Sequence, residues 1–292
     1  MKKVLICAFA LAIGLMLVAP AMAVAEPKKG KPTFVEEKGS GDGGQGGQSD
    51  KWILSNDAIS VWFHEKKPML KVFSTGEDGN KSGYMLKLER LYETDASGAE
   101  RAHINLNAAS LGWIATSEDE ADGLALTLEG NVASQGSAGG AATVKFVFHI
   151  NLNSSEVKFD VIVENWVWIS EDPANATLSL EMLTVSDVAT RNAENQASIG
   201  GKGYMRWEKN AERTHNNGTT GALKVEAKIE EEGKGSHITL TFNGTGGYQT
   251  LSYDPTIGVY GTNWNLIAGV IVLAAAGAAA VAIYAVNRKK VK

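Results

Sequence analysis

Apolar and polar residues alternate through most of the chain, and a long uninterrupted apolar run lies near each end. The alternation is clearest at residues 124–128, 144–152 and 223–230. A period of two is typical of β-strands with one buried face and one wet face. The sequence therefore predicts an all-β fold over residues 51–262, in the form of an antiparallel β-sandwich with long strands.

Two stretches modify this pattern. The small polar run Asn153-Ser154-Ser155 separates two long alternating segments, which predicts a hairpin between two strands. Residues 189–221 are polar and rich in Asn, Gly and Glu. They predict a long polar loop, with a short helix over residues 205–213.

The C-terminal apolar run is long enough to cross a membrane. Residues 266–286 are 21 consecutive uncharged, mostly apolar residues, and as a helix they would extend about 30 Å, the thickness of a bilayer core. We expect one transmembrane α-helix over residues 264–286. Residues 287–292 carry four cations, which predicts a short basic tail on the cytoplasmic side.

Small residues recur along one face of this expected helix. Ala274, Ala278 and Ala282 lie four residues apart, a spacing that permits close contact between helices in a membrane. The stripe favours lateral self-association or a partner helix. The alternative is that alanine is only an apolar filler.

The N-terminal run has the pattern of a secretory signal peptide over residues 1–25. Lys2 and Lys3 precede the apolar segment, and small residues near Ala23 and Ala25 offer cleavage points. An uncleaved signal remains open, because residues 4–25 are 22 uncharged residues and are long enough to span. Residues 26–50 end in a glycine-rich run, which predicts a flexible linker.

Together, these segments predict a single-pass cell-membrane protein with an extracellular ectodomain. Six of the 28 basic residues lie in the two terminal segments, which leaves 22 against 33 acidic residues, a charge near −11 for the exported part. This charge argues against nucleic acid as a partner. The single cysteine, Cys7, lies in the expected signal peptide, so the mature chain would contain no disulfide.

One segment matches the spacing of a calcium-binding loop, the only cofactor that the sequence suggests. Its oxygen ligands would be Asp78, Asn80, Ser82, the backbone carbonyl of Tyr84, and Glu89 at the twelfth position. The alternative is a glycine-rich β-turn that resembles the loop by accident, because the alternation after the turn predicts a strand in place of a helix.

Two tryptophans form the candidate ligand-binding site. If residues 157–170 form one regular strand, Trp166 and Trp168 lie on its polar face, about 7 Å apart. Exposed aromatic rings beside polar groups can stack on sugar rings or form a protein-binding hot spot. Two alternatives would bury them: a cover by residues 189–221, or a bulge near Asn165 that reverses the register.

Five asparagines satisfy the N-x-S/T glycosylation pattern, and all fall at expected turns. They are Asn80, Asn153, Asn175, Asn217 and Asn243. An exported chain would tolerate glycans at such positions, so we expect a glycoprotein if the host modifies asparagine.

Motifs for catalysis are not evident. The five histidines, His64, His103, His149, His215 and His237, show no paired spacing and no cysteine partners, which argues against a zinc site. Neither a nucleophile elbow nor a phosphate-binding loop is present. Paired carboxylates of a glycosidase meet only in three dimensions, so that possibility remains open.

The expected function is that of a non-catalytic surface protein for adhesion, envelope structure or the binding of a glycan or protein ligand. Two alternatives stay open. One is an accessory subunit that docks to a membrane complex through its helix, and the other is a carbohydrate-active enzyme on a β-sandwich.

Overall fold

The computed structural model describes residues 31–37, 51–64, 67–75, 82–106, 111–133, 141–152, 154–243 and 247–260. The expected signal peptide, the expected transmembrane helix with Ala274, Ala278 and Ala282, and the basic tail all lie outside the described residues. Within the described part of the chain, no helix has the length and apolar character needed to cross a bilayer.

The described residues are nearly all antiparallel β structure, which confirms the all-β expectation. One 3-10 turn, η3, covers Pro173–Asn175. The strands are β1 (Thr33–Glu37), β2 (Lys51–Ser55), β3 (Ile59–His64), β4 (Lys67–Ser74), β5 (Gly83–Thr94), β6 (Glu100–Asn105), β7 (Ile114–Glu120), β8 (Gly123–Ala133), β9 (Ala141–Asn151), β10 (Glu156–Glu164), β11 (Thr177–Val185), β12 (Ala189–Ala193), β13 (Gln196–Ile199), β14 (Gly203–Arg206), β15 (Asn210–Thr214), β16 (Thr220–Glu232), β17 (Gly235–Asn243), β18 (Thr250–Tyr253) and β19 (Thr256–Val259).

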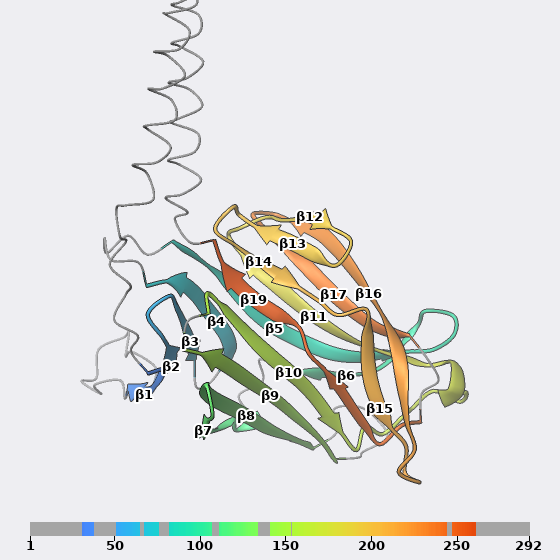
Figure 1. The fold of residues 1–292 in the computed structure, drawn as a ribbon. Coiled ribbons are helices and arrows are strands. Elements are labelled where there is room, and N and C mark those ends of the chain that lie inside the picture. Colours follow the sequence, from blue (N-terminus) through green and yellow to red (C-terminus); the bar gives the residue numbers. More distant parts are fainter. Residues whose placement is uncertain are drawn as a thin grey trace, which may run out of the picture.

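The strands form two ladders joined along one side. In the first ladder β16, β17, β11 and β5 are successive neighbours, β4 and β6 share the other edge of β5, and β3, β2 and β1 follow β4. In the second, β7, β8, β9 and β10 are successive, β18 and β19 share the other edge of β10, and β14, β13 and β12 follow β19. Strand β15 pairs with both β16 and β18 and so joins the ladders. In Figure 1, β9 and β10 of the second ladder are seen below β5 and β11 of the first, and the four strands run in a similar diagonal direction.

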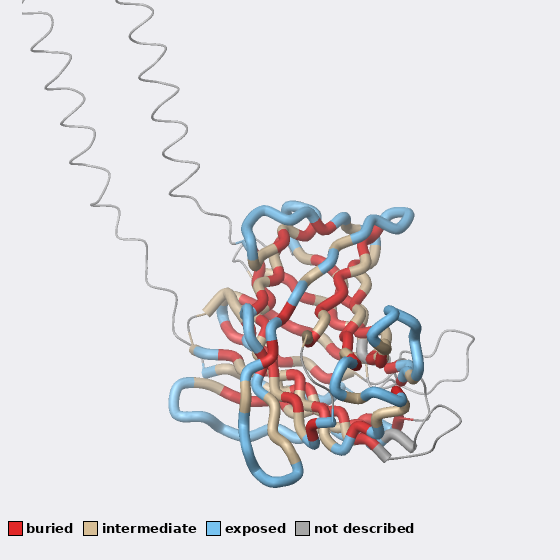
Figure 2. The backbone as a smooth tube through the Cα atoms, turned by 90° about the vertical axis from the view of Figure 1, so that its right-hand side faces the viewer, coloured by how far each residue is buried: buried red, intermediate tan, exposed pale blue. Residues whose placement is uncertain are grey.

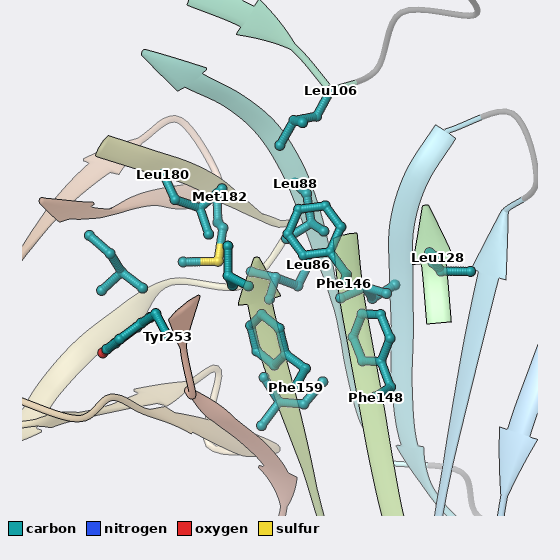
Figure 3. Packing of buried hydrophobic residues seen from close by; sticks show 14 of the residues in the cluster. Leu86, Leu88, Leu106, Leu128, Phe146, Phe148, Phe159, Leu180, Met182 and Tyr253 are labelled. Carbon is teal, nitrogen blue, oxygen red and sulfur yellow. The ribbon is translucent and has the colours of Figure 1, made fainter. Parts of the chain in front are cut away.

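The apolar faces of the two ladders enclose one core. Phe148 of β9 stacks on Phe159 of β10, with ring centroids 5.4 Å apart, and meets the edge of Phe63 of β3 at 4.5 Å. Figure 3 shows these β9 and β10 rings facing the side chains of Leu86 and Leu88 from β5. The core follows from the alternation in the sequence, since every second residue of these strands points inward. Figure 2 shows buried residues along the strands and exposed residues at the connecting turns.

Residues 189–221 do not form the long loop that we expected. They contain β12, β13, β14, β15 and the start of β16, and the helix expected over residues 205–213 is replaced by β14 and β15. Each strand contributes only one or two inward residues, such as Ala197 and Ile199 of β13, which are fully buried. Such short runs do not show a period of two, and the glycines in the turns between them give the segment the composition of a loop.

Two other expectations concern short segments. The hairpin expected at residues 153–155 is confirmed, because β9 and β10 pair antiparallel on either side of it; Asn153 itself lies outside the described residues. In the expected linker, the structure differs at β1, which pairs with β2 and packs Phe34 against the core. Phe34 is the one residue of β1 that is not exposed, so the strand has little local pattern to predict it.

Candidate ligand-binding depression

The chain changes direction immediately after β10, at Asn165. This residue has a φ of 58°, in the left-handed region that asparagine tolerates better than most residues. Its backbone N–H still donates to the carbonyl of Gln249 at 2.8 Å. The turn ends the strand and reverses the alternation beyond it, so Trp166 is only 7% exposed whereas Val167 is 43% exposed.

The expectation of two exposed tryptophans on the polar face is therefore wrong. The second of the two burial alternatives is the one observed, a break in register at Asn165. Trp166 belongs to the core, and Trp168 is half-buried and packs against it. A regular strand over residues 157–170 would have required a residue with ordinary β geometry at position 165.

Glu93 of β5 holds the segment after the turn in place. Its side chain is fully buried, and all its partners are donors. The indole Nε1 of Trp166 donates to Oε2 at 3.0 Å, the backbone N–H of Ile169 donates to both oxygens at 3.1 and 3.0 Å, and the N–H of Ser170 donates to Oε1 at 2.7 Å. Acceptance from three donors matches a carboxylate, which can accept but not donate. This single side chain fixes both the indole and the backbone beyond it.

Trp168 contacts Tyr248, which precedes β18. The two rings meet edge to face with centroids 4.9 Å apart, and the Trp168 Nε1 donates to the Tyr248 carbonyl at 3.4 Å. The Tyr248 side chain is 3% exposed, and its hydroxyl is buried without a hydrogen-bond partner. An edge-to-face pair of this kind fixes the orientation of both rings.

These residues line an open depression of about 520 Å³. Its walls are Asn165, Trp166, Trp168, Asn216, Gly247, Tyr248 and Gln249. All seven residues are uncharged, and three of them carry amides that can both donate and accept hydrogen bonds. Burial raises the pKa of the Tyr248 hydroxyl well above its ordinary value, so this hydroxyl remains protonated. The site thus presents aromatic rings and amides to a ligand.

Sequence reasoning identified the tryptophans but missed Glu93 and Tyr248. A signal for Glu93 is visible in β5, where Leu88 and Leu91 are three residues apart and thereby interrupt the alternation. After that break Glu93 falls on the buried parity. Tyr248 carries no such signal, because it is separated by 80 residues from Trp168 and its position depends on the pairing of β18 with β10.

A second depression, of about 460 Å³, lies among β15, β16 and β18. Its walls include three acidic residues, Glu208, Glu212 and Asp254. Sequence reasoning could not have grouped them, because the first two and the third come together only through the pairing of β15 with β18. Glycoside hydrolysis uses a pair of carboxyl groups, and a groove with several carboxylates could supply them.

A third depression, of about 430 Å³, includes His149 of β9 and residues of β10 and β14. The His149 ring lies between two carboxylates, with Nδ1 at 2.7 Å from Glu120 Oε1 and Nε2 at 3.1 Å from Asp160 Oδ2. The hydrogen bond to Asp160, followed by the one to Glu120, raises the pKa of His149 above its usual value. Both nitrogens therefore carry protons more readily than in a free histidine.

The residues of the expected calcium loop are only partly described. Asp78 and Asn80 lie outside the described residues. Ser82 immediately precedes β5, Tyr84 is buried in that strand with its hydroxyl donating to the Tyr204 carbonyl, and Glu89 lies further along it. Because β5 is extended, Ser82 and Glu89 are separated by about 20 Å, and one ion cannot contact both. The expected ligand set is therefore wrong in its twelfth position.

The candidate glycosylation sites fall at different kinds of position. Asn175 ends η3 and Asn217 lies in the turn between β15 and β16, and both are exposed. The Asn217 Oδ1 accepts a hydrogen bond from the hydroxyl of Thr219, the third residue of its sequon, at 2.7 Å. Asn243 is half-buried at the end of β17. Asn80 and Asn153 lie outside the described residues.

Comparison with known proteins adds little to this picture. No family model matches the chain, and no curated sequence is similar to it. Among solved structures, 4-alpha-glucanotransferase from Thermococcus litoralis is similar, with a TM-score of 0.42 and 11% sequence identity, over 79% of this chain and 40% of that one. This chain thus spans less than half the length of the glucanotransferase, and a likeness at this level carries no argument.

Proposed function

We propose that this chain is a non-catalytic, membrane-anchored cell-surface protein whose β-sandwich ectodomain binds a neutral sugar in the depression beside Trp168. The observation that carries the proposal is the chemistry of that depression. Its lining is entirely uncharged and combines aromatic rings with amides. The anchoring part of the proposal rests on the two apolar terminal runs of the sequence.

A neutral sugar fits this lining better than other common ligands do. Sugar rings have an apolar C–H face that stacks on an indole or phenol ring, and their hydroxyls both donate and accept hydrogen bonds. The amides of Asn165, Asn216 and Gln249 match such hydroxyls, because each amide also offers both functions. A phosphate or carboxylate ligand would require a cation in the lining, and the described lining residues include none.

The rigidity of the depression supports a binding role. Glu93 fixes the segment from Trp166 to Ser170 through hydrogen bonds, and Trp168 is fixed by its ring contact with Tyr248. A preformed site loses less side-chain freedom on binding, which improves the affinity that a given contact area supplies. None of the described sequon asparagines, Asn175, Asn217 and Asn243, is itself a lining residue, although Asn217 directly follows Asn216 of the lining.

The test is glycan-array binding of the full-length chain in mild detergent. For the neutral sugar that the wild type binds on the array, Trp168→Ala should lower the affinity by roughly 30-fold. This corresponds to the loss of about 2 kcal/mol that an aromatic hot-spot residue typically contributes. Trp62→Ala is the matched control, because Trp62 is also half-buried but lies on β3, away from the depression. Its affinity for the sugar should equal that of the wild type.

A comparison of Trp166→Ala with Trp168→Ala separates a loss of core stability from a loss of sugar binding. Because Trp166 is buried and bonded to Glu93, Trp166→Ala should lower the free energy of unfolding by about 3–5 kcal/mol. Trp168→Ala should cost much less stability. Unchanged sugar binding in Trp168→Ala, or no binding of any neutral sugar by the wild type, would refute the proposal.

A carbohydrate-active enzyme is the second candidate. One observation favours it, the gathering of Glu208, Glu212 and Asp254 in the groove among β15, β16 and β18. The same array distinguishes the two functions, because an enzyme would release reducing sugar from the immobilised glycans and a binding protein would leave them intact.

A further inference from the structure

Three adjacent strands bring two carboxylates and one imidazole together on the outer face of the first ladder. Glu89 comes from β5, Glu181 from β11 and His237 from β17. Strand β11 pairs with β5 on one side and with β17 on the other. The possible ligand atoms of the three side chains all lie within 4.8 Å of one another. The sequence gives no hint of this group, because its members are separated by 92 and 56 positions.

A β-bulge in β5 lies at Glu89. The register between β5 and β11 shifts at Glu181 and Met182, so that Glu181 faces Arg90 while Met182 faces Leu88. Glu89 is the extra residue. Leu88 and Leu91 are both buried, and the two residues between them point outward together. The alternation from Tyr84 to Leu88 already sends Glu89 outward, and the bulge turns Arg90, the partner of Glu181, to the same face.

Two of the three distances between the ligand atoms match those of a tetrahedral metal site, and the third pair lies within 4.8 Å. His237 Nδ1 lies 3.5 Å from Glu89 Oε2 and 3.4 Å from Glu181 Oε1. Zinc bonds to nitrogen and oxygen are about 2.0–2.2 Å long, and tetrahedral geometry then separates neighbouring ligand atoms by about 3.4 Å. An ion at the centre of the three atoms would have a fourth position towards solvent, because the side chains are 13–23% exposed.

The second polar atom of each side chain is already held by another residue. Lys87 Nζ contacts the other oxygen of Glu89 at 2.6 Å, and Arg90 Nη2 contacts the other oxygen of Glu181 at 2.9 Å. The Nε2 of His237 contacts a carboxylate oxygen of Glu232. In metal sites, such outer partners orient the ligands and fix the histidine tautomer.

We propose that Glu89, Glu181 and His237 form a binding site for a divalent transition-metal ion, with zinc as the best match. The imidazole nitrogen favours zinc over calcium and magnesium, which take oxygen ligands. Two carboxylates and a neutral imidazole balance the charge of the ion, and Glu232 is the positioning residue that orients the ring. The site is separate from the depression beside Trp168, so each proposal can fail without the other.

The experiment uses the full-length chain without a polyhistidine tag, stripped of metal with a chelator and titrated with zinc by calorimetry. Cobalt is the spectroscopic probe, since tetrahedral Co²⁺ absorbs visible light strongly. The wild type should bind a single zinc ion and give the tetrahedral cobalt spectrum. His237→Gln and Glu181→Gln should each lose zinc affinity by at least about 100-fold, and Glu232→Gln should lose about 10–100-fold.

His215→Gln is the control, because His215 lies at the end of β15, away from β5, β11 and β17, and its zinc affinity should equal that of the wild type. Glu89→Gln provides an independent ligand variant should either of the others fail to fold. A wild type that takes up no zinc, zinc binding that persists in the ligand variants, or calcium bound as tightly as zinc would each overturn the proposal.

Discussion

Replacement of Glu93 by glutamine tests how the candidate depression is held. Glutamine keeps the size of the side chain but exchanges one acceptor oxygen for an NH₂ group. In the wild type, Oε1 accepts from the N–H groups of Ser170 and Ile169, and Oε2 accepts from the Trp166 indole and the Ile169 N–H. Either orientation of the amide therefore directs an NH₂ group at an N–H donor.

The magnitude follows from counting the groups left without partners. At least one N–H donor and the new NH₂ group would be buried and unsatisfied, and each such group costs about 1–3 kcal/mol. We expect Glu93→Gln to lower the free energy of unfolding by about 3 kcal/mol. A domain with a typical stability of about 5–15 kcal/mol would remain folded. Sugar binding should weaken as well, because the segment that carries Trp168 loses its attachment to Glu93.

The assay is urea denaturation of the full-length chain in detergent, followed by tryptophan fluorescence, with the slope against denaturant unchanged. The control is Glu194→Gln, since Glu194 is 78% exposed and pairs only at the surface with Lys209; such a change should cost less than about 0.5 kcal/mol. If Glu93→Gln matched this control, the carboxylate would not be the organising group that its contacts indicate.

Two further predictions concern other parts of the fold. The pKa of His149 is raised in the folded state by Asp160 and Glu120, so the stability it contributes is complete below its unfolded pKa of about 6.5 and is lost as pH rises through the higher folded pKa. The melting temperature of the wild type should therefore fall, relative to that of His149→Gln, as the pH rises above about 6.5, and parallel curves would contradict the ion-pair assignment. Gly203→Ala should lower the free energy of unfolding by about 1–3 kcal/mol through overpacking, because the new Cβ would lie 2.3 Å from the Tyr84 ring. An unchanged melting temperature would show that β14, which carries Gly203, and β5, which carries Tyr84, move apart without cost.

The general architecture was accessible from the sequence because long strands display their period directly. In β9, every second residue from Val144 to Ile150 is apolar, and these four residues, Val144, Phe146, Phe148 and Ile150, are all fully buried. The same reasoning failed for β12 to β15, where strands of four or five residues contain at most two inward side chains each. Their existence depends on pairing with neighbours that are distant in the sequence, and no local pattern reports that pairing.

The candidate sites depend on departures from regular strand geometry. A single left-handed residue, Asn165, moved Trp166 from the expected wet face to the core. A single extra residue in β5 brought Glu93 to the buried face. Each departure shifts every following side chain by one position, so an error of one residue reverses an inward or outward assignment. Sequence patterns identify which residues carry the chemistry more readily than which side of a sheet they occupy.

The position of β19 has a mechanical consequence. This last described strand lies between β10 and β14 and forms hydrogen bonds with both. If the chain is anchored by its C-terminal end, as proposed, a force pulling the ectodomain away from the cell is transmitted first to β19. The load is then divided between two neighbouring strands, and the force does not act on an edge strand that is paired on one side only.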